Sequence, residues 1–426
     1  MTTAHKSCVL DMTRGDPFRL LLQFSLPLFC SNLLQQVYNL TDTALAGHLL
    51  GSAALAEIGA TAALYGLIMN FAFGMNNGLA LTVSRCFGAG EREGIRRAVG
   101  WMVTLSAAVS IVLTTVSLLG RGALLQVLQV PAEVWDGAAA YLTVILLGIP
   151  LTMLYNMEAA LLRAVGNSVT PLLFLLFSSV LNVGLDAAFM GPLGMGVRGA
   201  AVATVLAQGI SAVLGAVYLV RSYPELHFAP AHLKKSARRA VMNMFWAGMS
   251  MGLMSAIYNL GSVALQSSIN ALGSVYITAQ TAARRMAEMY FIPGGALGIG
   301  VATFSSQNLG AGRRSRIGQI VRAALKIYFV WWLFVLAFTF LLGEPVLRLI
   351  TGSSDVRIIS NAMLYLKISV PIIPPFAVWL VPVWGYRAVC FCEPTTWVIC
   401  FVFILLAVWH CRSDLQDACP PDKTPA

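Results

Sequence analysis

The sequence predicts an all-α polytopic membrane protein with two parallel six-helix lobes, in which the twelfth helix is missing or corrupted. Of its 426 residues, 58% are hydrophobic and 11% are charged, whereas soluble domains average about 25% charged residues. Apolar runs long enough to cross a bilayer follow one another, and short motifs recur about 220 residues apart. This composition excludes a soluble enzyme, a nucleic-acid binder and a disordered chain.

The helices are predicted from the length of the apolar runs, because a bilayer core needs about 20 apolar residues in a helix. The runs that qualify lie at 18–44, 52–82, 96–119, 134–157, 168–190, 197–220, 240–268, 274–302, 317–342, 357–383 and 388–409. The first, second, seventh and eighth are long and contain polar residues, so we expect them to tilt or bend. Pro27 removes a backbone donor inside the first helix and predicts a kink there.

The basic residues orient these helices. When the N-terminus is placed in the cytoplasm, Lys and Arg gather in cytoplasmic segments, above all at 85–97, 234–239 and 313–326. The net charge of +10 therefore reflects membrane topology and not a nucleic-acid partner.

Internal repeats indicate a duplication. Tyr38-Asn39-Leu40 recurs as Tyr258-Asn259-Leu260, 220 positions later, and Gly88-Ala89-Gly90 recurs as Gly310-Ala311-Gly312, 222 positions later. Because the repeated unit has six helices, an even number, both copies enter the membrane in the same orientation. Such parallel repeats place a substrate path between two lobes.

The chain accordingly divides into an N-terminal tail, two lobes, a linker and a polar tail. Their ranges are 1–16 (cytoplasmic tail), 17–220 (N-lobe, helices 1–6), 221–239 (cytoplasmic linker), 240–410 (C-lobe, helices 7–11) and 411–426 (polar tail). No counterpart of helix 197–220 follows in the second copy, and the sequence after about residue 376 matches its counterpart poorly. We interpret this as a frameshifted or truncated C-terminus, with a genuine eleven-helix variant as the alternative.

Acidic residues inside apolar helices are functional candidates, because charge is costly in a bilayer. Asp42 lies in the first helix, while Asn182 and Asp186, four residues apart, share one face of the fifth. Thr204 lies in the sixth helix at a matching depth. Two neighbouring carboxyls cannot both ionise cheaply, so the group is expected to hold a proton, and the same oxygens suit Na⁺. The alternative is a buried network that only holds the helices together.

Polar residues before Asp42 predict a substrate pathway. Asn39 and Gln35 precede it by three and seven residues on the same face, and Tyr38 lies beside them. Tyr258 and Asn259 are their repeat counterparts in the seventh helix. Hydrogen bonds that join neighbouring helices are the alternative interpretation.

Motifs for enzymatic chemistry are absent from the sequence. The run from Gly194 to Gly199 matches GxGxxG, but it forms a turn between two membrane helices and no strand precedes it. The sequence contains no P-loop, HExxH or CxxC motif. We therefore expect neither an enzyme nor an organic cofactor, and no metal other than a coupling Na⁺.

Three runs resemble the multidrug and toxic compound extrusion (MATE) family. Leu181 to Asp186 and Gly194 to Thr204 resemble its helix five to six signature, and Gly298 to Gly312 resembles its loop between helices eight and nine. The resemblance covers residues 12 to about 375 and is greatest to the prokaryotic DinF-like branch. It implies an antiporter that exports small organic cations in exchange for H⁺ or Na⁺ by alternating access. It further implies a monomer in the bacterial inner membrane, with lipid as its surroundings and the N-terminus in the cytoplasm.

The resemblance also implies site residues. The branch carries a coupling network in the N-lobe, which falls on Asp42, Asn182, Asp186 and Thr204 here. The acids that other branches use in helices seven and ten have no counterpart in this sequence. Bending of the first helix at Pro27 would link ion binding to transport.

Two alternatives to drug export follow from the sequence. One is a flippase for lipid or lipid-linked precursors in the same superfamily, which would require more basic residues than the pair Arg284 and Arg285. The other is an inactive, truncated transporter.

Overall fold

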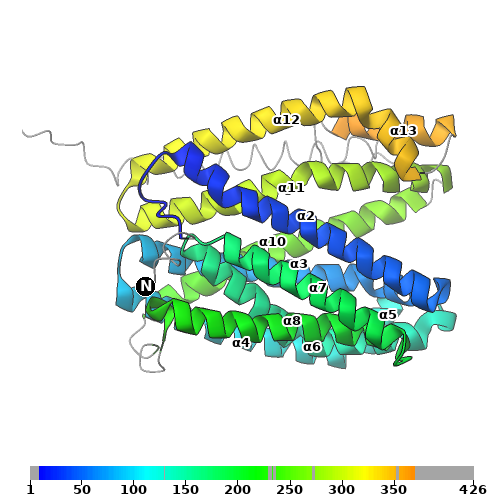
Figure 1. The fold of residues 1–426 in the computed structure, drawn as a ribbon, viewed down its shortest axis with the longest axis horizontal. Coiled ribbons are helices and arrows are strands. Elements are labelled where there is room, and N and C mark those ends of the chain that lie inside the picture. The colour runs from blue at the N-terminus through cyan, green and yellow to red at the C-terminus, as the bar shows by residue number, and fades with distance from the viewer. Residues whose placement is uncertain are drawn as a thin grey trace, which may run out of the picture. The chain divides into compact units, whose positions relative to one another are not determined.

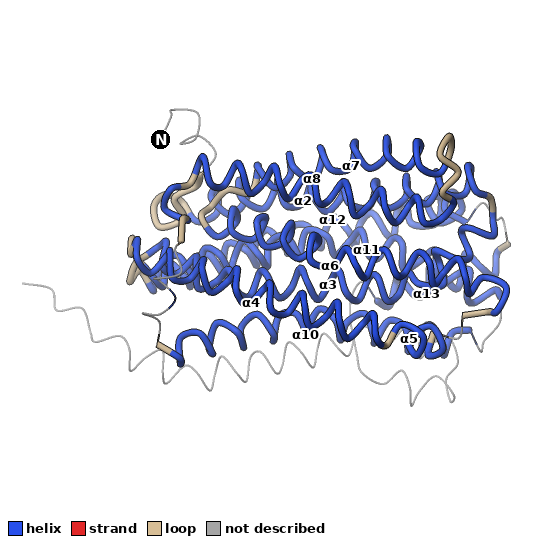
Figure 2. The backbone as a smooth tube through the Cα atoms, turned by 90° about the horizontal axis from the view of Figure 1, so that it is seen from below, coloured by secondary structure: helices blue, strands red, loops and turns tan. Residues whose placement is uncertain are grey.

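The computed structural model describes residues 9–128, 130–228, 233, 237–270, 274–351 and 355–369, without the side chains of 52, 257–270, 274, 368 and 369. Regular structure in this part of the chain is helical (Figures 1 and 2). The elements are α2 (Pro17–Leu50), α3 (Ser52–Gly88), α4 (Arg92–Leu119), α5 (Arg121–Val127), η1 (Ala132–Val134), α6 (Trp135–Ala164), α7 (Val169–Met190), α8 (Gly196–Ser222), η2 (Pro224–Leu226), α10 (Arg238–Asn270), α11 (Ser274–Gly310), α12 (Arg314–Thr351) and α13 (Val356–Ser369). Within the described residues, 7 helices are long and apolar enough to cross a membrane: α2, α3, α4, α6 with η1, α7, α8 and α12.

Most predicted spans coincide with a helix, but several helices run further than predicted. Each predicted span from 18–44 to 317–342 falls on one helix, and α13 covers the first part of 357–383. The span 388–409 and the polar tail lie outside the described residues. The helix α11 reaches Gly310 instead of ending at residue 302. The polar end of this helix meets polar groups of other segments, since the amide of Gln307 donates to the carbonyl of Ala164 at 2.8 Å.

Packing divides the structure into two compact units that differ from the sequence halves. The first comprises Met1–Leu260 and Ile292–Tyr328, and the second comprises Gly261–Phe291 and Phe329–Ala426. The ranges of α10, α11 and α12 each contain a boundary between the units. The division into an N-lobe and a C-lobe at 221–239 is inferred from the sequence repeat, and it stays a prediction.

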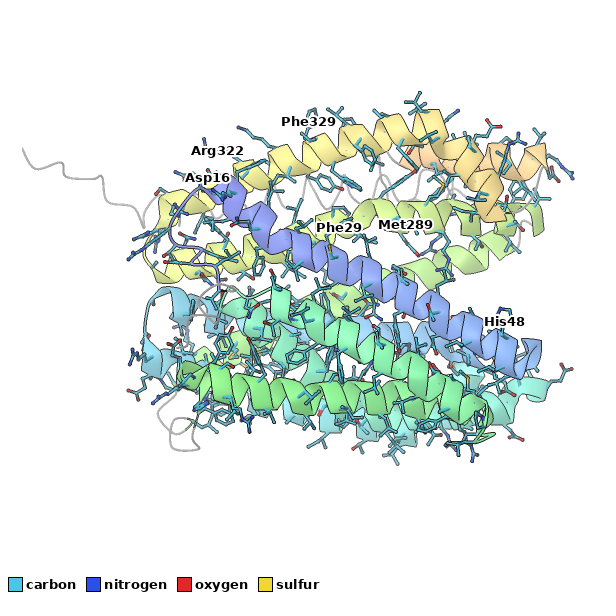
Figure 3. All side chains as sticks on the ribbon, viewed as in Figure 1. Asp16, Phe29, His48, Met289, Arg322 and Phe329 are labelled. Atoms are coloured by element: carbon cyan, nitrogen blue, oxygen red, sulfur yellow. The ribbon has the colours of Figure 1, made fainter. Side chains whose placement is uncertain are left out.

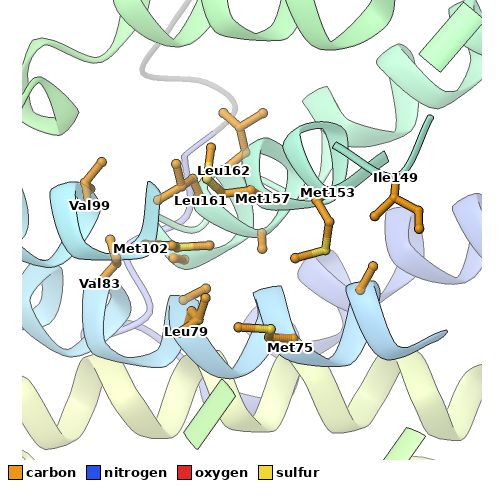
Figure 4. Packing of buried hydrophobic residues seen from close by; sticks show 14 of the residues in the cluster. Met75, Leu79, Val83, Val99, Met102, Ile149, Met153, Met157, Leu161 and Leu162 are labelled. Atoms are coloured by element: carbon orange, nitrogen blue, oxygen red, sulfur yellow. The ribbon is translucent and has the colours of Figure 1, made fainter. Parts of the chain in front are cut away.

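The largest core of the first unit joins α3, α4 and α6. Met75 and Leu79 of α3, Met102 of α4 and Met153 of α6 are almost fully buried and interleave between the helices (Figure 4). Methionine fills irregular gaps between helices that are fixed by other contacts. This core supports the helices that carry the candidate site.

The ends of α3 and α11 touch through their backbones in a reciprocal contact. A Cβ atom added at Gly88 would collide with the Gln307 carbonyl, and one added at Gly310 would collide with the Arg85 carbonyl. Arg85 and Gln307 are 222 positions apart, as are the two glycines, so the contact joins equivalent parts of the repeat. Ser84 donates to the carbonyl of Thr303 at 3.2 Å in the same crossing. The duplication read from the sequence therefore has a spatial counterpart.

The segment before α2 docks on residues far along the chain. The carbonyl of Met12 accepts from Asn308 at 2.9 Å, and that of Gly15 accepts from Arg316 at 2.9 Å. Asp16 then caps the helix by accepting from the backbone of Arg19 at 2.8 Å. Figure 3 marks Asp16 and His48 near the two ends of α2.

The second unit packs α13 against parts of α11 and α12. Trp331 donates to the carbonyl of Tyr290 at 2.9 Å, and Thr339 donates to the Tyr290 hydroxyl at 3.1 Å. Tyr365 and Leu366 of α13 are fully buried in its core. Polar groups inside these helices thus find partners, as an apolar environment requires.

Replacing Asn167 by Ala is expected to destabilise the fold by about 1–3 kcal/mol, because buried partners lose their hydrogen bonds. Asn167 is fully buried in the turn between α6 and α7, accepts from the Thr170 backbone at 3.0 Å and donates to the Tyr223 hydroxyl at 2.9 Å. Thermal unfolding in detergent measures the change. Asn70→Ala is the control, because Asn70 is exposed and bonds only its own helix. Equal melting temperatures for the two variants would contradict the assignment.

Candidate functional site

The helices α2, α7 and α8 bring together the four residues predicted to couple ion binding to transport. Asn182 and Asp186 of α7 and Thr204 of α8 are buried, and Asp42 of α2 is partly buried. The amide of Asn182 donates to the Thr204 hydroxyl at 3.4 Å, which in turn donates to the carbonyl of Ala200 at 3.1 Å. The i, i+4 spacing on α7 thus directs both of its polar side chains into one site.

The carboxyls of Asp42 and Asp186 face each other within hydrogen-bonding reach. Among the described residues, no donor reaches Oδ1 of Asp42, either oxygen of Asp186 or Oδ1 of Asn182. Buried polar atoms normally have partners, so these oxygens indicate a site that can take up a proton or a cation. A proton shared by the carboxyls would supply the missing donor. The same four oxygens also form a suitable set for a hard cation such as Na⁺.

Three tyrosines surround this pair. Tyr38 of α2, one turn before Asp42, lies close enough to Thr204 for their side chains to interact. Tyr65 of α3 and Tyr141 of α6 lie close enough to interact electrostatically with Asp42. Aromatic walls around two acids give the site a low dielectric, which raises the cost of leaving both carboxyls charged.

The sequence reasoning missed Tyr65, Tyr141 and a hydrogen-bonded pair beyond Thr204. Tyr65 contacts Gln208 of α8, and Thr152 of α6 donates to the Gln208 side chain at 2.6 Å. Gln208 lies four residues after Thr204, so the helical spacing was a usable signal for it. The two tyrosines lie on other helices, and no sequence pattern connects them to Asp42.

The predicted pathway residues are only partly gathered. Gln35 donates to Asn39 at 3.2 Å, and Asn39 is exposed, so this hydrogen bond runs along α2 itself. Of the three predicted pathway residues on α2, Tyr38 alone lies close to Thr204 and Asp42. The helix α2 continues through Pro27, whose carbonyl accepts from the Ser31 hydroxyl at 2.9 Å. The side chains of Tyr258 and Asn259 lie outside the described residues. Their roles in a pathway stay predictions.

Comparison with known proteins gives one family. A family model described as MatE matches residues 27–188 and again residues 250–409. The two matches agree with the predicted duplication, and the second extends beyond the point near residue 375 where the resemblance read from the sequence ends.

Curated relatives are similar over most of their length. "Probable multidrug resistance protein YpnP" of Bacillus subtilis (strain 168) is 29% identical over 307 residues, covering 72% of this chain and 68% of that protein. "Probable multidrug resistance protein NorM" of Thermotoga maritima is 25% identical over 353 residues, covering 82% and 75%.

Solved structures confirm the fold. A crystal structure of MATE in complex with MaD3S superposes with a TM-score of 0.79 at 21% identity, covering 94% of this chain and 98% of that chain. An outward-facing conformation of a multidrug resistance MATE family transporter of the MOP superfamily gives a TM-score of 0.75 at 23% identity, covering 89% and 92%. The predicted all-α, duplicated membrane architecture is therefore confirmed.

Proposed function

The chain belongs to the MatE family of multidrug efflux transporters, and from this premise we propose that it is a secondary active antiporter. It exports small organic cations across a bacterial plasma membrane in exchange for H⁺, with its N-terminus in the cytoplasm. Na⁺ is the alternative coupling ion. The chain works as a monomer in lipid, without an organic cofactor and without a covalent step that would make it an enzyme.

The contact between Asp42 and Asp186 carries this proposal. Asp186 is buried and Asp42 is partly buried, and three of their four carboxyl oxygens lack donors among the described residues, so the pair gains stability by taking up one positive charge. Such a group supplies what an exchanger needs, because it can bind the coupling ion in one state of the protein and release the ion in the other.

Exchange requires that ion and substrate favour different states of the protein. Asp42 lies on α2, whereas Asp186 and Thr204 lie on α7 and α8. Charging or neutralising the pair therefore changes how strongly α2 is held against its neighbours. Pro27 lies inside the same helix and removes one backbone donor, so we expect α2 to bend there during the exchange.

Uptake of a fluorescent organic cation into inside-out membrane vesicles tests the function. For one-for-one exchange with a monovalent cation, a tenfold H⁺ gradient, roughly 1.4 kcal/mol, sustains about a tenfold gradient of the cation. A protonophore is expected to abolish this accumulation at constant Na⁺. Accumulation that follows an imposed Na⁺ gradient at equal pH would replace H⁺ by Na⁺.

Vesicles that contain the inserted protein but accumulate no cation under either gradient would refute the export proposal. Movement of a labelled lipid between leaflets, measured in the same vesicles, would then favour the flippase.

A further inference from the structure

A second buried carboxyl lies on α6, away from the Asp42 and Asp186 pair. Glu158 is only 4% exposed, and its Oε1 has no hydrogen-bond partner among the described residues. It lies six residues before the end of α6 at Ala164, the end that the predicted orientation places in the cytoplasm. The proposed exchange does not use this group so far.

The carboxyl occupies a niche that α8 provides for it. A Cβ atom added at Gly215 would collide with Oε2 of Glu158, so only glycine leaves room there. The hydroxyl of Ser211, one turn earlier on α8, is completely buried and also lacks a partner among the described residues. Glu158, Ser211 and Tyr155 line a cavity of about 10 Å³. A cavity of that size holds about one water molecule.

No described cation neutralises Glu158. Arg163, on the same helix, donates to the Asn77 side chain at 3.1 Å and lies 5.5 Å from the centre of the Phe73 ring, both on α3. The other residues that line the cavity with Glu158 are Tyr155, Ala159 and Leu162 of α6, Pro171 and Phe174 of α7, and Ser211 of α8. None of these carries a charge near neutral pH. An uncompensated buried carboxylate is costly, so this environment favours a carboxyl that carries a proton.

A stripe of polar side chains connects this niche to the candidate site. Thr204, Gln208, Ser211 and Gly215 follow one another at helical spacing on one face of α8. Thr152, Tyr155 and Glu158 follow one another at intervals of three residues on α6. The stripe spans 11 residues of α8, or about 16 Å, from Thr204 to Gly215. The hydrogen bond from Thr152 to Gln208, at 2.6 Å, joins its two sides.

The stripe is interrupted in the state described. The hydroxyl of Ser211 finds no partner among the described residues, so the bonded groups around Gln208 stop short of Glu158. A continuous path would let protons cross without substrate. A path that becomes continuous only when α6 and α8 shift, or when water enters the cavity, keeps the exchange coupled.

We propose that Glu158 is an inner proton-binding station of the transporter. The proton leaves the Asp42 and Asp186 pair, passes hydroxyl groups and water along the α6 and α8 stripe, binds Glu158 and is then released to the cytoplasm. No other bond is made or broken. This inference rests on the proposed H⁺-coupled export and adds the route by which the proton leaves.

Glu158→Gln in proteoliposomes tests the station. H⁺-driven uptake of a fluorescent organic cation is expected to fall about tenfold, while exchange of labelled for unlabelled cation at equal pH persists. Glu57→Gln is the matched control, because Glu57 also packs against a glycine, Gly137, but near the other end of the membrane helices. It is expected to leave both rates unchanged. Wild-type H⁺-driven uptake in Glu158→Gln would overturn the station while leaving coupled export intact.

Labelling with dicyclohexylcarbodiimide, which modifies protonated carboxyls in apolar surroundings, tests the same inference without transport. Mass spectrometry is expected to find Glu158 modified at about pH 6 and several-fold less at about pH 9. This difference is expected because a carboxyl that exchanges its proton is protonated less often at the higher pH. Equal modification at both pH values, or none, would overturn the station. If the wild type shows no H⁺-driven uptake, the export proposal fails, and this labelling still decides whether Glu158 exchanges a proton.

Discussion

Asp186→Asn is expected to lower H⁺-driven export about 5- to 150-fold, which corresponds to losing about 1–3 kcal/mol of coupling between ion and substrate. The side chain is fully buried, and no described donor reaches either of its oxygens. Asn keeps the shape of Asp but cannot bind or release the proton. The rate of export under a fixed pH gradient measures the loss, and the melting temperature shows whether the fold is intact.

The double variant sharpens this test. If the neighbouring carboxyls of Asp42 and Asp186 act as one proton-binding unit, as proposed, Asp42→Asn is expected to add little to the loss caused by Asp186→Asn. Asp136→Asn is the control, because Asp136 is exposed in the first turn of α6. If Asp186→Asn exported as fast as the wild type, the site would be a structural network and not a coupling site.

Gly310→Ala is expected to shift the protein away from the conformation described. The added methyl group would collide with the Arg85 carbonyl, and backbone atoms cannot move aside as a flexible side chain can. Overpacking of this kind costs about 1–3 kcal/mol, which corresponds to a change of about 5- to 150-fold in the population of a conformation with α3 and α11 separated at this crossing. Gly88→Ala is expected to act in the same way, because it meets the Gln307 carbonyl across the same crossing.

A cysteine at position 84 reports this change. Ser84 is buried beside Thr303 in the crossing, so Ser84→Cys should react slowly with a maleimide in the described state. In the Gly310→Ala background its labelling, followed by mass spectrometry, is expected to accelerate. Gly298→Ala on the same helix is the control, since a Cβ there meets nothing within 4 Å. Equal labelling in the two backgrounds would show that α3 and α11 do not separate at this crossing.

The helices and the centre of the site were predictable because local patterns encode them. Apolar length located the spans, and the i, i+4 spacing of Asn182 and Asp186 placed both on one face of α7. The same rule, applied once more from Thr204, would have found Gln208. Tyr65 could not be found in this way, because its approach to the site depends on how α3 packs and not on its own neighbours in sequence.

Partner choice is where sequence reasoning was least informative. Asn39 shares the face of Asp42 by spacing, yet it bonds Gln35 and stays exposed. Glu158 and Arg163 have opposite charges on one helix, but they face α8 and α3 respectively. Hydropathy gives the depth of a residue in the membrane, whereas its partner depends on the rotation of each helix about its axis.

The docking of the N-terminal segment also constrains how the chain is made. Met12 and Gly15 bind Asn308 and Arg316, which leave the ribosome about 300 residues later. At about 5–20 residues per second, the segment waits roughly 15–60 s for its partners. During that time the early helices must stay in the bilayer without the contacts to Asn308 and Arg316. Assembly of the first unit is therefore completed late in translation, and a pause before Arg316 would prolong the exposure of an unfinished intermediate.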